Sequence, residues 1–167
     1  KSLGNSPDPV ELIDKYGADA LRVGLLIIVP QGLDILFSED KIEQGRNFMN
    51  KLWNSARFLL MNIGDNNLDN FKSLDYNTLD ITDQWILSSL NRTILKVNKA
   101  YDDYKMNDAV KDVYNFVYND FCDWYIEFSK SRLYGKNEQD SRKNLIVAIH
   151  VLKTILKLLH PYTPFIT

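Results

Sequence analysis

The alternation of apolar and polar positions predicts a chain built almost entirely from amphipathic helices. Through several long stretches, apolar residues recur every three or four positions, which places them on one face of an α-helix. The expected helices cover residues 9–17, 18–28, 38–64, 82–101, 107–135 and 139–159. Four long helices with short connections predict an all-α fold, in the form of an antiparallel bundle.

The two short helices and a short extended piece at 33–37 are expected to form a small platform ahead of that bundle. We therefore divide the chain into a platform, residues 1–37, and a helical domain, residues 38–167. A polar stretch at 65–80 is the clearest linker. Residues that favour the N-cap position mark where the helices begin. The expected N-caps are Asp8, Ser38, Thr82 and Asn107.

The helix at 38–64 has two different faces when its residues are placed about 100° apart. The apolar face holds Phe48, Met49, Leu52, Trp53, Ala56, Leu59, Leu60 and Ile63. The opposite face holds Arg46, Asn47, Asn50, Lys51, Asn54, Arg57 and Asn62, together with the ring of Phe58. A solvated face usually carries Glu–Lys pairs, whereas amides, cations and a flat ring suit the binding of unpaired bases. The alternative is a face that packs on a neighbouring helix through polar contacts.

Composition narrows the possible functions. A length of 167 residues with 45% hydrophobic content fits one domain, or one domain with a small appendage. A net charge of −2 gives no bulk attraction to phosphate, so any nucleic-acid binding must rest on a local patch. Cys122 is the single cysteine, which excludes an internal disulfide and fits a reducing compartment. Together with His150 and His160 it has no spacing typical of a metal site.

Two further groups of residues carry side chains that can serve catalysis or binding. The carboxylates Asp120 and Asp123 lie one helical turn apart, but no nucleophile accompanies them, so a solvated face is the better interpretation. The consecutive rings of Trp124 and Tyr125 are expected to pack against two different neighbours. The longest apolar run, residues 23–30, is too short to cross a membrane. The chain alone is not predicted to be an enzyme.

Several short blocks of the sequence are distinctive when they are taken in order. The first five residues are KSLGN, and further blocks are YGADALR at 16–22, GRNF at 45–48, NKLWN at 50–54, FCDWYIE at 121–127 and LLHPYTPFIT at 158–167. The first block is similar to the end of the KMSKS signature loop, and together the blocks resemble the valyl-tRNA synthetase family of the class I aminoacyl-tRNA synthetases. The resemblance covers the whole chain. It implies a piece of a larger synthetase, from the end of that loop through most of the anticodon-binding domain, truncated at its C-terminal end.

The resemblance implies that the parent enzyme is a monomeric, cytoplasmic ligase. It would join valine to its tRNA with ATP and Mg²⁺ through valyl-adenylate. The platform would contact the tRNA stem, and the bundle would bind the anticodon loop of the valine isoacceptors. Lys1 would contact ATP phosphates in the parent, while this chain by itself would bind no cofactor. The residues expected to contact tRNA are Arg46, Asn47, Asn50, Lys51, Asn54, Arg57 and Phe58.

Two alternatives remain open from the sequence. The blocks are also related to those of the isoleucyl and leucyl enzymes, so the parent could act on either of those amino acids. The chain could instead be a non-enzymatic helical module whose polar face docks another protein.

Overall fold

The computed structural model describes residues 7–28, 37–63 and 75–167, and every regular element among them is a helix. The elements are α1 (Pro9–Tyr16), α2 (Ala18–Ile28), α3 (Glu39–Ile63), η2 (Tyr76–Thr78), α4 (Ile81–Asp102), α5 (Met106–Asn115), η3 (Phe116–Tyr125), α6 (Ile126–Leu133) and α7 (Glu138–Leu159). The all-α prediction is confirmed.

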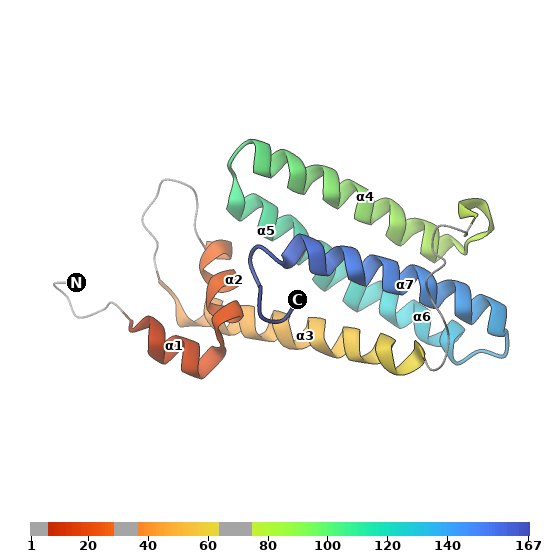
Figure 1. The fold of residues 1–167 in the computed structure, drawn as a ribbon, viewed down its shortest axis with the longest axis horizontal. Coiled ribbons are helices and arrows are strands. Elements are labelled where there is room, and N and C mark those ends of the chain that lie inside the picture. Colours follow the sequence, from red (N-terminus) through yellow and green to blue (C-terminus); the bar gives the residue numbers. More distant parts are fainter. Residues whose placement is uncertain (1–6, 29–36, 64–74) are drawn as a thin grey trace.

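Four rods form the body of the molecule (Figure 1). They are α3, α4, the continuous rod α5–η3–α6, and α7, and successive rods run in opposite directions along the bundle. The short helices α1 and α2 lie beside the first half of α3, and the C-terminal end of the chain returns to the same side. The predicted platform helices therefore lie at one end of the bundle.

Local chemistry accounts for most helix ends. Asp8 caps α1 by accepting the backbone N–H of Val10 at 2.8 Å, and Pro9 fills the first helical position, where no N–H is required. Gly17 ends α1 with φ at 90°, a conformation that a side chain disfavours. The expected cap at Thr82 is wrong, because the Asp80 carboxylate accepts the Thr82 N–H at 2.9 Å.

The expected N-cap at Asn107 is also wrong, because α5 already begins at Met106 and its N-cap position is Lys105. The rest of this rod differs from the prediction in its winding. From Phe116 to Tyr125 it is π-helical, and the backbone N–H of Ile126 donates to the carbonyl of Phe121, five residues back. This widened stretch changes which side chains face inward beyond it.

The main core lies between the four rods. Its largest fully buried side chains include Tyr125, Phe48, Phe121, Leu52, Leu59, Ile86, Leu90 and Ile155. A second, small cluster of Leu12, Leu21 and Ile42 joins α1, α2 and α3. α2 crosses α3 closely at Gly45, where an added Cβ would lie 2.3 Å from the carbonyl oxygen of Ala20.

The predicted apolar face of α3 is only partly correct. Phe48, Leu52 and Leu59 are buried as expected, but Trp53 and Leu60 are exposed. The buried stripe instead passes through the small residues Gly45 and Ser55. The reason is that α3 is contacted from two sides, by α2 near its start and by η3 further along.

Some sequence predictions fall outside the described residues. These are the extended piece at 33–36, Lys1 and the linker up to residue 74. The division between residues 37 and 38 stays a prediction. Among the described helices, none combines the length and apolar character needed to span a membrane. The same residues contain no group of three His, Cys, Asp or Glu side chains placed to hold a metal ion.

Candidate nucleic-acid interface

A shallow groove of about 430 Å³ runs between α3 and the rod formed by η3 and α6. The α3 wall consists of Asn47, Asn50, Lys51, Asn54, Ser55 and Phe58. The opposite wall consists of Cys122, Ile126, Glu127 and Lys130. The three asparagines are exposed, so their amides are available along the rim to donate and accept hydrogen bonds. Five of the seven residues predicted to contact tRNA thus line one surface.

Lys51 is held within the protein rather than extended into solvent. Its Nζ atom lies 3.3 Å from the ring centroid of Tyr118 and forms a short ion pair with the Asp123 carboxylate. Both contacts join α3 to η3. Lys51 therefore contributes positive charge at a fixed position and helps to hold the two walls together.

The floor of the groove is small and weakly polar. Ser55 donates a hydrogen bond to the Cys122 sulfur at 3.2 Å, and both side chains are buried. Burial raises the pKa of the Cys122 thiol, so it stays protonated and unreactive. The small Ser55 side chain lets η3 approach α3 closely at this point.

Phe58 closes one end of the groove. Its ring is half-buried and packs edge to face against Tyr134, with 6.4 Å between ring centroids. Lys130 lies above the same ring at 6.0 Å and pairs with Glu127 at 2.6 Å. Phe58 thus contacts a second ring while it lines the groove, and an aromatic ring in such a position suits the stacking of a base.

Two of the predicted residues lie elsewhere. Arg46 pairs with Glu43 of its own helix at 2.9 Å and lies 5.4 Å from the ring centroid of Tyr16 on α1. Arg57 is on the other side of α3, where it lines a separate apolar hollow with Trp53. Neither arginine lines the groove.

Sequence reasoning missed the far wall of the groove. Lys130 and Glu127 come from a helix about seventy residues further along the chain, and a single-helix projection gives no information about which helix faces α3. The excess of cations after residue 129 hints at Lys130, but not at its position. The expectation that Trp124 and Tyr125 pack against two different neighbours is confirmed only for Tyr125, which is fully buried. Trp124 is 57% exposed, and its ring lies 5.7 Å from that of Phe128 on the same rod.

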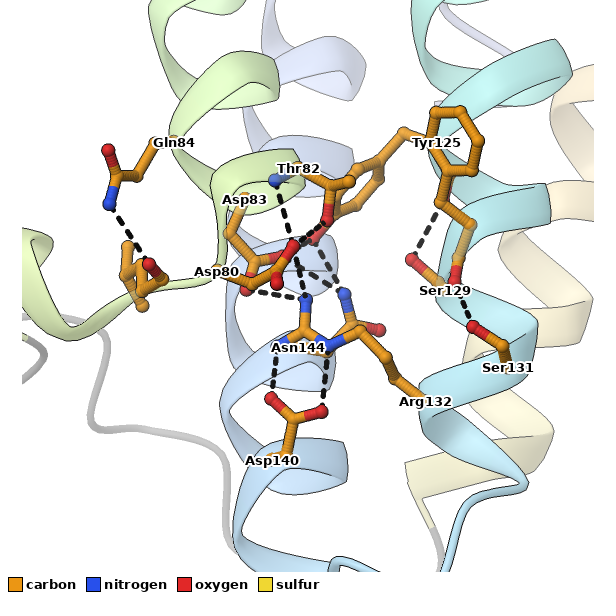
Figure 2. Close-up of polar contacts among 12 residues, drawn as sticks. Asp80, Thr82, Asp83, Gln84, Tyr125, Ser129, Ser131, Arg132, Asp140 and Asn144 are labelled. Atoms are coloured by element: carbon orange, nitrogen blue, oxygen red, sulfur yellow. Dashed lines mark hydrogen bonds and ion pairs between the residues drawn. The ribbon is translucent and has the colours of Figure 1, made fainter.

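A buried polar network holds α6, the outer wall of the groove, against the bundle. Figure 2 shows its side chains converging from α4, from the η3–α6 rod and from α7. The Asp83 carboxylate, fully buried, accepts hydrogen bonds from Tyr125 at 2.6 Å, Arg132 at 2.8 Å and Asn144 at 3.0 Å. Arg132 also donates two hydrogen bonds to Asp140, at 2.6 and 3.0 Å.

This network is fully charge-paired at its centre, as burial of a carboxylate requires. Hydrogen bonds to Asp140 and Asp83 hold the guanidinium charged, and they raise the pKa of Arg132 against the effect of burial. Burial and the adjacent Asp83 carboxylate raise the pKa of the Tyr125 phenol well above its ordinary value. The network therefore fixes the position of α6 and, with it, the groove.

Comparison with known proteins assigns this chain to a class. A family model described as the anticodon-binding domain of tRNA ligase matches residues 83–167, slightly more than half of the chain. The chain therefore belongs to the anticodon-binding domain family of tRNA ligases.

The relatives of the whole chain are more specific. The valine–tRNA ligase of Clostridium tetani is 48% identical over 168 residues, and that of Latilactobacillus sakei is 45% identical over 167 residues. Each alignment covers 100% of this chain and 19% of the relative, so the chain spans about a fifth of the length of these ligases. The resemblance to the valyl enzymes is confirmed.

A solved structure shares the fold. Mycobacterium tuberculosis methionyl-tRNA synthetase bound to methionyl-adenylate aligns with a TM-score of 0.76 and 26% identity. The alignment covers 99% of this chain and 33% of that chain.

Proposed function

We propose that this chain is the part of a valine–tRNA ligase that binds the anticodon end of the tRNA, through the groove between α3 and the η3–α6 rod. The observation that carries the proposal is that Asn47, Asn50, Asn54 and Phe58, chosen from the sequence for base recognition, line one groove with two lysines. The identity of 48% to a valine–tRNA ligase over the whole chain supports valine isoacceptors as the substrates.

Each wall has a distinct role in this proposal. The exposed amides on α3 form hydrogen bonds with the edges of unstacked bases, and the Phe58 ring stacks on one of them. Lys130 contacts phosphate, since a flexible cation at a groove edge suits a point contact with the backbone. Arg57 and Arg46, outside the groove, contact the flanking stem or loop phosphates.

The chemistry of charging lies with the rest of the parent ligase. There, ATP and Mg²⁺ supply the adenylate step, and Lys1 contacts the ATP phosphates. The parent acts as a monomer in the cytoplasm.

The test uses the full-length ligase carrying Asn54→Ala or Phe58→Leu. Leucine keeps an apolar side chain against Tyr134 but removes the flat face, so a stacked base loses about 1–3 kcal/mol. We expect the KM for valine tRNA to rise by at least about fivefold, with valine-dependent ATP–pyrophosphate exchange unchanged. Asn98→Ala, at an exposed position on α4, is the matched control for Asn54→Ala.

Two results would refute the proposal. One is an unchanged KM in both groove variants together with unchanged discrimination against a tRNA whose anticodon has been swapped. The other is faster charging with isoleucine or leucine than with valine, which would assign the ligase to a different amino acid.

A further inference from the structure

Two side chains of α2 hold the backbone of the segment that follows α7. The Asp19 carboxylate, only 7% exposed, accepts the backbone N–H of Ile166 at 2.8 Å and that of Phe165 at 3.2 Å. Arg22 donates from Nε to the carbonyl of Tyr162 at 2.7 Å and from its second terminal nitrogen to the carbonyl of Pro161 at 3.0 Å. We call these four contacts the α2 clamp.

The residue types of the clamp match the groups they bind. Asp19 and Arg22 are three positions apart and so lie on one face of α2. A carboxylate only accepts hydrogen bonds and a guanidinium only donates them, so the pair engages both kinds of backbone group in a short segment. The Arg22 cation also lies just beyond the end of α7, where unpaired carbonyls carry partial negative charge.

The clamped segment and α2 are each fixed to other helices. The Tyr162 ring is buried and stacks on Tyr101 of α4, with 6.2 Å between centroids and planes 12° apart. α2 is fixed to α3 by the close crossing at Gly45. α2 therefore connects the helix that carries the groove to the end of the last helix of the bundle.

The clamp also links the part of the chain that matches the family model to a helix that lies outside the match. Residues 83–167 match the anticodon-binding family, whereas Asp19 and Arg22 lie ahead of the match, on the platform helix α2. We infer that the clamp sets the orientation of the bundle relative to this platform, so that Asp19 and Arg22 are positioning residues for tRNA charging.

This inference rests on the proposed function. The anticodon and the amino-acid-accepting end lie at opposite ends of a tRNA, so a ligase holds the molecule at two separate places. A rigid span between two binding surfaces gives the second contact a high effective concentration, and a loose span lowers it. Releasing the clamp is expected to weaken tRNA binding without touching the chemistry of amino-acid activation.

The experiment uses the full-length ligase with Arg22→Ala and Asp19→Asn. Asparagine keeps the size of the side chain but removes its charge, and its N–H₂ group replaces the oxygen that faces the Phe165 N–H at 3.4 Å. We expect the KM for tRNA to rise roughly five- to tenfold, within the range of ordinary site-to-site coupling. Valine-dependent ATP–pyrophosphate exchange is expected to stay at the wild-type rate. Arg22→Lys keeps the positive charge but lacks the two N–H donors that reach separate carbonyls. We therefore expect it to raise the KM for tRNA less than Arg22→Ala does.

Arg92→Ala and Asp102→Asn are matched controls at exposed positions on α4. Thermal unfolding of each variant separates stability from positioning. If clamp variants unfold earlier but charge tRNA with the wild-type KM, the clamp only stabilises the fold and the inference is wrong. If Arg22→Ala does not fold, Asp19→Asn and Arg22→Lys provide the same comparison. If the groove variants Asn54→Ala and Phe58→Leu also leave the KM unchanged, the proposed function fails instead.

Discussion

Replacing Arg132 with methionine measures how strongly the outer wall of the groove depends on the buried polar network. Arg132 is 12% exposed and donates three hydrogen bonds, one to Asp83 and two to Asp140. Methionine retains an unbranched apolar stem of similar reach but removes the charge and every donor. The substitution therefore tests the charge pairing rather than the packing.

The magnitude follows from the burial of the two carboxylates. Asp83 is fully buried, so removing its cation leaves an uncompensated charge, at a cost of about 3–5 kcal/mol. Asp140 is 38% exposed, and the loss of that pair adds only about 0–1 kcal/mol. The expected loss in the free energy of unfolding is therefore about 3–6 kcal/mol. In a chain of this size that loss corresponds to a fall of roughly 6–24 °C in the thermal unfolding midpoint.

The assay is urea denaturation of the chain and its variants, followed by circular dichroism. Asp83→Asn in the Arg132→Met background removes the unpaired charge, so the double variant is expected to be more stable than the sum of the single losses predicts. Lys153→Met, an exposed cation on α7, is the matched control. A loss of less than about 1 kcal/mol for Arg132→Met, the value typical of a surface pair, would refute the reasoning.

Two further predictions concern stability. The pKa of Tyr125 is raised in the folded state, by burial and by Asp83, so the fold holds this proton more tightly than the unfolded chain does. The resulting stability is complete below about pH 10 and is lost as the pH rises above it, and Tyr125→Phe should flatten that alkaline limb of the unfolding curve. Gly45→Ala should lower stability by about 1–3 kcal/mol in urea denaturation, because its Cβ would meet the Ala20 backbone at 2.3 Å; wild-type stability would refute the close crossing.

The sequence predicted the helices well because periodicity and end chemistry are local. It predicted α2 with the observed bounds and α3 to within a residue at its N-terminal end. The sequence was a poorer guide to which side chains of α3 are buried. A helical projection assumes a single buried face, whereas neighbouring helices contact α3 on two sides. Gly45 and Ser55 are buried because they are small at those contacts, and hydropathy does not report this.

Only one wall of the groove could be predicted, because only that wall depends on a pattern within a single helix. Its α3 wall was found because amides and a ring on one helix face are visible in a projection. The far wall depends on η3, where π-helical winding adds residues to each turn and shifts the phase of the helix beyond it. The ring of Trp124 is exposed although the sequence predicts that it packs, and Ile126 and Ser129 beyond it are buried. The contacts of Asp83 with Tyr125, Arg132 and Asn144 span 42 to 61 positions and have no local pattern.

The α2 clamp has a consequence for how this region can vary among related chains. Asp19 and Arg22 bind main-chain atoms, so the recognised groups are the same whatever side chains the C-terminal segment carries. The exposed side chain at position 165 can change in size and polarity, whereas Ile166 packs against the main core. Proline is excluded at both positions because the clamp needs their N–H groups. We expect the acid and the arginine three residues apart on α2 to be invariant among related chains.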